Sequence, residues 1–302
     1  MKVETLRTSA PEFIEYCKAH RREHDESYLD NDALSGFVPG EDNPTYLLRG
    51  GRGELLGVVS LMLGGAFRKN KKGRFRILHA RPLSFAAYSA LLNAIIKDLP
   101  GIETVYLFLP EERAEVGDIL IRLGFFIERY AWVLTRGREV PVPEPVFPEG
   151  YRVERLRVGA DEQLWCDICN STFSEFGWHT ELTPGMVKAS EEAYERLGGG
   201  LYMLWDGEAP VGILKIEAFS DENKAEIGPI AVLPRYHGMG LGRNLLRFGL
   251  NTAYAAGFET VELSVNGDNN KAAALYVSEG FEQDTLMLCY TKRLGSHKAR
   301  HL

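Results

Sequence analysis

The amino-acid sequence predicts an α/β protein of two tandem domains, each with a mixed β-sheet covered by helices on both faces. Three observations predict this fold class. Short segments recur about 156 residues apart, a proline-rich stretch separates the two copies, and each copy contains antiparallel strands followed by a strand–helix–strand crossover. Such a crossover makes its two strands parallel, so the sheet becomes mixed.

The recurrence defines the two copies. The segment Ile-Glu-Thr-Val at 102–105 recurs as Phe-Glu-Thr-Val at 258–261, and Gly-Phe at 124–125 recurs at 280–281. Both pairs have the same offset of 156 residues, and a third, weaker match upstream has an offset of 155. Agreement between offsets indicates an internal repeat, because each match alone is too short to do so.

The stretch between the copies contains four prolines, at positions 141, 143, 145 and 148. Proline lacks an N–H and has a fixed φ, so this stretch continues neither a helix nor a central strand, and we expect a semi-rigid linker. The predicted division is a first domain at 1–137, the linker at 138–150 and a second domain at 151–302.

Each copy is predicted to contain the same elements in the same order. A first helix with an apolar stripe precedes two strands, whose connecting turn is rich in glycine and charge. A third strand, the crossover helix and a fourth strand follow, and a helix and a strand end the copy. In the first copy we expect a helix at 12–22, strands at 45–48, 55–63 and 75–79, a helix at 86–99 and a strand at 104–109. In the second we expect a helix at 161–171, strands at 201–205, 211–219 and 225–232, a helix at 240–256 and a strand at 260–265.

Composition excludes several classes of protein. The formal charge of −7 argues against a nucleic-acid partner, which usually requires a basic face. The sequence contains no apolar run of membrane-spanning length and no basic-then-apolar signal at its start. We therefore expect a cytoplasmic monomer or homodimer that binds neither nucleic acid nor membranes.

Cys166 and Cys169 form a C-x-x-C pair, which superficially matches a redox motif. Redox chemistry needs the first cysteine at a helix N-terminus after a strand, where its pKa is lowered. Here the pair shares a helical stripe with Leu164, Trp165 and Ile168. We interpret both cysteines as small apolar residues of a buried helix face.

The most informative segment is the strand at 225–232 with the turn at 238–242, in which every second residue is glycine. Glycine lets the backbone approach an anion closely, and the N-terminus of the following helix favours phosphate. The G-x-G-x-G spacing differs from the dinucleotide pattern and from the Walker sequence. The alternative is a loop that only caps the helix.

Residues 151–294 resemble the GCN5-related N-acetyltransferases, the GNAT superfamily. The family motif V-x-P-x-x-[RQ]-G-x-G-[IL]-G is met by residues 232–242, except that His237 replaces Arg or Gln. A second signature, N-x-x-A-x-x-L-Y-x-x-x-G-F, is met in full by residues 269–281. The two-copy plan, with activity in the second copy, also resembles that of the mycothiol synthases.

The resemblance implies where acetyl-CoA, the acyl donor, would bind. The strand would pair with the pantetheine amides as an added strand does, and backbone N–H groups of the turn would hold the pyrophosphate. Asn269 would hydrogen-bond the cofactor, and Tyr276 would lie beside its sulfur. The expected cofactor-binding residues are Ile230, Ala231, Val232, His237, Gly238, Met239, Gly240, Leu241, Gly242, Arg243, Asn269 and Tyr276. No metal is expected to take part.

Two residues are the expected catalytic groups. Tyr276 can return a proton to the thiolate leaving group, because a phenol is a suitable acid. The acceptor amine must lose a proton, and Glu226 is the first choice as base, with Glu217 as the rival. Gly228-Pro229 predicts a bulge beside Glu226, since proline within a sheet marks a bulge or an edge. A solvated strand glutamate is the alternative interpretation of either carboxylate.

The acceptor side is predicted from a cluster of aromatic residues between the first helix and the second strand of the second copy. Phe176 and Trp178 are the expected substrate-binding residues, and they could line a pocket for an amine. An aromatic cluster that fills the core is the alternative. Small-molecule amines and peptide N-termini are both possible acceptors.

The first copy lacks the residues that carry the prediction. At the offset of 156, the three glycines of the turn fall on Pro82, Ser84 and Ala86. Tyr276 falls on Leu120, and Asn269 falls on Arg113. The first copy is therefore predicted to be a degenerate domain.

The sequence thus predicts an N-acetyltransferase whose C-terminal domain transfers acetyl from acetyl-CoA to a primary amine by direct attack. Two alternatives remain open. One is a non-catalytic module that binds acyl-CoA, and the other is an acyltransferase that uses a different acyl-CoA.

Overall fold

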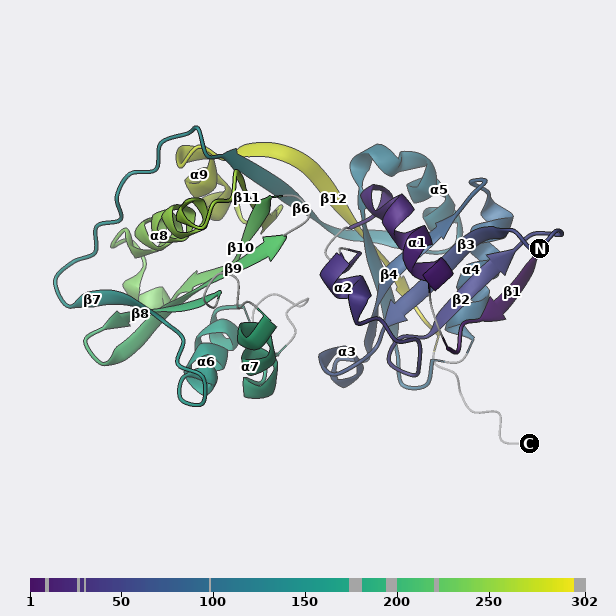
Figure 1. The fold of residues 1–302 in the computed structure, drawn as a ribbon, viewed down its shortest axis with the longest axis horizontal. Coiled ribbons are helices and arrows are strands. Elements are labelled where there is room, and N and C mark those ends of the chain that lie inside the picture. The colour runs from purple at the N-terminus through teal and green to yellow at the C-terminus, as the bar shows by residue number, and fades with distance from the viewer. Residues whose placement is uncertain are drawn as a thin grey trace. The chain divides into compact units, whose positions relative to one another are not determined.

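The computed structural model describes residues 1–8, 11–25, 28–29, 31–97, 99–173, 181–193, 200–219 and 223–295. The chain divides into two compact units. Unit 1 is Met1–Ala131 together with the segment from Thr285, and unit 2 is Trp132–Asp284. Each unit has a mixed sheet with helices on both faces (Figure 1), which confirms the predicted fold class.

Unit 1 contains five strands of the first copy. They are β1 (Lys2–Thr5), β2 (Thr45–Arg49), β3 (Leu55–Met62), β4 (Lys72–Ala80) and β5 (Thr104–Pro110). Its helices are α1 (Pro11–His20), α2 (Asn31–Ser35), α3 (Ala66–Lys69), α4 (Phe85–Ile96) and α5 (Ala114–Arg122), with short 3₁₀ turns η1 (Arg21–Glu23) and η3 (Glu111–Arg113). Strands β1 to β4 are antiparallel neighbours, and β4 and β5 are parallel.

Two apolar layers hold unit 1 together. Leu91 of α4 and Leu120 of α5 are fully buried on one face of the sheet. Phe13 of α1 and Leu34 of α2 are fully buried on the other face, where they pack with Ile77 of β4. Strand β3 is buried on both faces because it lies in the middle of the sheet.

Unit 2 repeats this plan. Its strands are β7 (Tyr151–Arg155), β8 (Leu201–Asp206), β9 (Ala209–Phe219), β10 (Lys224–Val232) and β11 (Thr260–Asn266). Its helices are α6 (Glu162–Phe173), α7 (Pro184–Ala193), α8 (Leu241–Ala255) and α9 (Asn270–Ser278), with a 3₁₀ turn η5 (Pro234–Tyr236). Strands β7 to β10 are antiparallel neighbours, and β10 and β11 are parallel.

The core of unit 2 also has two layers. Leu245 and Leu250 of α8 pack with Val261 of β11 on one face. On the other face, α6 contributes Cys166 and Cys169, which are buried free thiols in an apolar cluster. Burial raises the pKa of the Cys169 thiol to about 12, which is opposite to the shift that a redox cysteine needs. The apolar interpretation of the C-x-x-C pair is therefore confirmed.

The two 12-residue strands β6 (Phe126–Gly137) and β12 (Glu282–Arg293) each run from one unit into the other. In unit 1, Met287–Arg293 pairs antiparallel with β5. In unit 2, β6 is the neighbour of β11. In each unit, the strand that ends the crossover (β5 or β11) therefore has the last strand of the other copy as its neighbour. The division expected from the sequence follows chain order and does not include this exchange.

The predicted elements lie within a few residues of the observed ones. The first helix ends at His20, earlier than expected, and a 3₁₀ turn follows it. The crossover helix of unit 1 starts at Phe85, because the Ser84 side chain accepts a hydrogen bond from the Ala87 N–H and caps it. Residues 138–150 form no helix or strand, as the prolines predict. None of the described helices has the length and apolar character needed to cross a membrane.

Candidate active site

The strand β10 is interrupted where the sequence predicts a bulge. Its register with β9 shifts between Ile227 and Ile230, so Gly228 and Pro229 form the irregularity. Its parallel pairing with β11 covers only the segment 224–226, opposite 260–262. The two strands are therefore paired before the bulge and not after it, and the place where they part is a gap in the strand ladder.

The backbone of β10 beyond the bulge faces this gap. The Leu233 N–H donates to the Val211 carbonyl of β9 at 2.9 Å. Because hydrogen-bonded and non-hydrogen-bonded pairs alternate in an antiparallel ladder, the N–H and C=O of Val232 point away from β9. These two backbone groups are on the edge of β10 where β11 no longer pairs, in the segment expected to pair with pantetheine amides.

His237 hydrogen-bonds one of these two groups, the Val232 carbonyl. Its Nε2 lies 2.8 Å from the Val232 carbonyl oxygen, so the ring N–H donates to the end of the strand. The ring is therefore turned back on β10, and the carbonyl of Val232 already has a partner. The expectation that the residue at 237 contacts phosphate then depends on its backbone or on its other ring nitrogen.

The glycine-rich turn has the backbone conformation that only glycine adopts readily. Gly238 and Gly240 have φ values of +81° and +77°, and Gly240 is the residue before α8. A Cβ added at Gly238 or at Gly242 would meet no atom of the described chain within 4 Å. The turn thus has open space at these two glycines, beside the N-terminus of α8.

The side chains of the turn differ in what they face. Met239 is 48% exposed, whereas Leu241 is buried in the core beneath α8. Arg243 forms an ion pair with Glu279 and donates to the Ser278 hydroxyl at 3.1 Å. Leu241 can therefore contribute only backbone to a ligand, and the Arg243 guanidinium is held on α9.

Asn269 and Tyr276 lie at the two ends of α9. The side-chain oxygen Oδ1 of Asn269 accepts from the Ala272 N–H at 3.2 Å and caps the helix. The side-chain NH₂ group of Asn269 remains a donor. The Tyr276 ring is 8% exposed and packs edge-on to Phe281 at 6.0 Å. Burial raises the pKa of Tyr276 to about 12, so the phenol carries its proton at neutral pH.

Glu226 lies directly opposite Glu217 of β9 and Glu262 of β11. Residues opposite each other on neighbouring strands point to one face, so the three carboxylates form a row. Ala225 and Ile227, which flank Glu226, pack in the core beneath α8. The row is therefore on the face of α6, whereas Tyr276 is in the core layer of the opposite face.

Two lysines accompany the row. Lys215 pairs with Glu217 and Lys224 pairs with Glu262, both at 2.9 Å. Among the described residues, the row therefore combines carboxylates with ammonium groups. Phe176 and Trp178, the expected substrate-binding residues, lie outside the described residues.

Glu279 is a buried carboxylate that pairs with two arginines, and no sequence motif indicates it. Its side chain is 2% exposed and accepts from Arg247 at 2.7 and 2.9 Å and from Arg243. Its backbone carbonyl accepts from the buried Arg136 at 2.8 Å. Burial alone would raise the pKa of Glu279, but the hydrogen bonds from the two arginines outweigh it and lower the pKa. Glu279 thus fixes α9, with Tyr276, to the first two turns of α8.

We expect Glu279→Ala to destabilise unit 2 by about 3 kcal/mol. Breaking a buried ion pair costs about 3–5 kcal/mol, and the lower end applies because Arg243 is 41% exposed and can turn to solvent. Chemical denaturation followed by tryptophan fluorescence would measure this. Glu259→Ala is the control, because that glutamate is 62% exposed in its pair with Arg138. Equal effects of the two substitutions would contradict the role of Glu279.

Comparison with known proteins gives a consistent result. Residues 165–281 match the acetyltransferase (GNAT) family. The mycothiol acetyltransferase of Streptomyces bingchenggensis is 31% identical over 146 residues, which are 46% of this chain and 46% of that protein. That of Geodermatophilus obscurus is 31% identical over 163 residues, 51% of this chain and 53% of that protein. The chain spans about half the length of the curated relatives it matches.

Solved structures show the same fold over nearly the whole chain. A GCN5-related N-acetyltransferase from Sphaerobacter thermophilus has a TM-score of 0.71 at 17% identity and covers 96% of this chain, with 95% of that chain covered. A tandem GNAT protein from the clavulanic acid biosynthesis pathway also has a TM-score of 0.71, at 14% identity, with 97% and 98% covered. Residues 165–281, which lie in unit 2, thus match the GNAT family, and nearly the whole chain has the fold of the tandem GNAT structure.

Proposed function

We propose that unit 2 is an N-acetyltransferase that transfers the acetyl group of acetyl-CoA to a primary amine. The observation that carries this proposal is the combination of the gap in the ladder beside β10 with the glycine turn at the start of α8. Both lie at the same end of β10, so one extended ligand can pair with the strand and place an anion at the helix.

The residues present fit acetyl-CoA. The open space above Gly238 and Gly242 leaves room for a pyrophosphate against the N–H groups of α8. The N–H of Val232 faces the gap, where an amide of pantetheine could accept from it. Bound acetyl-CoA would supply an activated acetyl group as a thioester.

The protein residues would then manage two protons. On the α6 face, Glu226 would accept the proton of the incoming ammonium group, directly or through water. Glu217 and Glu262 lie on either side of Glu226, and each is paired with a lysine. In the opposite layer, Tyr276 would donate its proton to the departing thiolate. Since its pKa is raised to about 12, the phenol remains the acid over the whole neutral range.

The acceptor is proposed to be a small molecule, because the curated relatives carry the name mycothiol acetyltransferase. A cytoplasmic location agrees with an acetyl-CoA substrate. The proposal is tested by measuring thiol release from acetyl-CoA over a panel of primary amines, with mass spectrometry of the product. Binding of acetyl-CoA without release on any amine would instead favour a non-catalytic module.

The glycine turn gives a prediction of its own. We expect Gly242→Gln to raise the KM for acetyl-CoA at least tenfold and to leave stability unchanged or up to about 1 kcal/mol higher. Gln is a better helix former than Gly, and at this second position of α8 the new side chain meets no described protein atom, so only the ligand would be obstructed. Steady-state kinetics and thermal denaturation would measure both effects.

The control uses a shorter donor. Acetyl-pantetheine lacks the pyrophosphate, so wild type and Gly242→Gln are expected to have similar KM values for it. An equal loss with both donors would show that the substitution disturbs the protein rather than the pyrophosphate site.

A further inference from the structure

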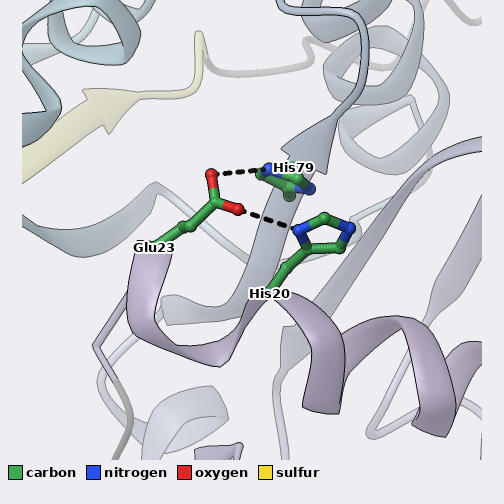
Figure 2. A group of neighbouring side chains, drawn as sticks. All are labelled: His20, Glu23 and His79. Carbon is green, nitrogen blue, oxygen red and sulfur yellow. Dashed lines mark hydrogen bonds and ion pairs between the residues drawn. The ribbon is translucent and has the colours of Figure 1, made fainter.

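Unit 1 contains a cluster of metal-ligating side chains, drawn in Figure 2. His20 and Glu23 lie one turn apart where α1 passes into η1, and His79 projects from the end of β4. The ligand atoms of these three residues all lie within 4.8 Å of one another. Glu23 Oε1 is 2.8 Å from His20 Nδ1, and Glu23 Oε2 is 3.2 Å from His79 Nε2.

The position of the cluster corresponds to that of the candidate active site in unit 2. Strands β4 and β5 pair only over 72–74 and 104–106, so they separate toward the end of β4 that carries His79. Arg113, which aligns with Asn269, follows β5 and pairs with Glu23. Unit 1 therefore has polar side chains at the position that corresponds to the gap in unit 2.

A metal would replace two hydrogen bonds within the cluster. His20 Nδ1 and His79 Nε2 each face an oxygen of the Glu23 carboxylate, which can only accept, so each of these nitrogens carries the proton in the metal-free state. Each imidazole must move this proton to its other ring nitrogen before the nitrogen that faces Glu23 can bind a metal. In His79 that other nitrogen, Nδ1, has the Tyr16 hydroxyl as its partner.

Tyr16 and His24 lie beside His79 of the cluster. The Tyr16 hydroxyl lies 2.8 Å from His79 Nδ1 and therefore orients the ring with Nε2 toward Glu23. Histidine ligands of metals commonly have such a partner on the other nitrogen. The His24 ring lies edge-on to His79 at 5.6 Å, and its buried Nε2 has no hydrogen-bond partner among the described residues. The polar groups here are thus not all satisfied by the chain itself.

Two arginines compete for the carboxylate. Arg81 donates to Glu23 Oε1 at 2.8 Å, and Arg113 donates to Oε2. Their side chains are 61% and 32% exposed, so both can turn to solvent. Glu23 is therefore able to exchange these partners for a metal ion, at a cost in affinity.

We propose that His20, Glu23 and His79 form a binding site for a divalent cation of the zinc class, in exchange with the Arg81 and Arg113 ion pairs. Two imidazoles and one carboxylate are a ligand set that zinc uses with a water as fourth ligand. A nitrogen-rich set of this kind disfavours Mg²⁺ and Ca²⁺, which prefer oxygen ligands. No motif in the sequence indicates this site, because the ligands come from positions 20, 23 and 79.

The test is equilibrium dialysis of the full chain against Zn²⁺, with the bound metal measured by mass spectrometry. We expect one equivalent per chain in wild type and in His237→Ala, a histidine variant outside the cluster. His20→Ala should lose that equivalent, and it is a suitable variant because His20 is 19% exposed and its removal disturbs the core little. The Co²⁺-loaded protein should show the visible absorption of a tetrahedral site, and His20→Ala should not.

The competing arginine gives a sharper result. Arg81→Ala removes one rival cation from Glu23 and should bind Zn²⁺ up to about fivefold more tightly, the effect of an exposed ion pair. Tyr16→Phe should weaken Zn²⁺ binding about 10- to 100-fold, because it removes the hydrogen bond that orients the ligand His79. Absence of Zn²⁺ from wild type and Arg81→Ala alike, or equal retention in His20→Ala, would overturn the proposal and leave a purely ion-paired cluster.

Discussion

Deletion of the chain from Thr285 onward is expected to unfold unit 1. This segment belongs to unit 1 although it begins 154 residues after Ala131, where the N-terminal part of the unit ends. The deletion removes Tyr290, which is 5% exposed in the core formed by α4, α5 and β5. Truncating one such buried aromatic costs about 3–5 kcal/mol, and a whole domain has only about 5–15 kcal/mol of stability. Loss of the strand ladder on β5 adds to this cost.

Hydrogen exchange measured by mass spectrometry would locate the effect. Peptides from β4 and β5 should lose protection, and the exposed edge of β5 should make the shortened chain aggregate. Deletion from residue 296 is the control, because it leaves all of β12 in place. Retained protection of β5 after the longer deletion would contradict the role of β12 in unit 1.

The second large effect is expected for Tyr276→Phe. Removal of a general acid should lower kcat about 100- to 10,000-fold with little change in the affinity for acetyl-CoA. Because the pKa of Tyr276 is raised to about 12, its acid form persists to high pH, and the wild-type rate should not fall through titration of this phenol below about pH 10. Steady-state kinetics across pH would measure both.

Tyr254→Phe is the matched control. Tyr254 is 8% exposed, as is Tyr276, but its hydroxyl contacts Arg136 at 3.0 Å and two backbone carbonyls. We expect this substitution to lower stability and to leave kcat nearly unchanged. A similar kcat for Tyr276→Phe and Tyr254→Phe would exclude Tyr276 as the acid.

Much of unit 2 could be predicted because its signals are local. The bulge at Gly228-Pro229 follows from the properties of proline, and the turn at 238–242 follows from its glycines. Local chemistry is therefore what the sequence predicts best.

The features that the sequence did not predict join distant residues. The Glu279 centre joins α9 to α8 and to Arg136, which lies 143 positions away. The Glu23 cluster joins α1, β4 and η3 through side chains that form no motif. The exchange of β6 and β12 was also not foreseen, because alternation indicates which face a strand buries and not which strand it pairs with.

The exchange of the last strands has a consequence for the order of events during synthesis. The first copy leaves the ribosome well before Met287–Arg293 is made, so β5 lacks its neighbour in that interval. At a translation rate of about 5–20 residues per second, the interval is on the order of ten seconds or more. The N-terminal unit therefore completes its fold only after Met287–Arg293 has been made, and a chaperone that shields β5 during this time should increase the yield of native protein.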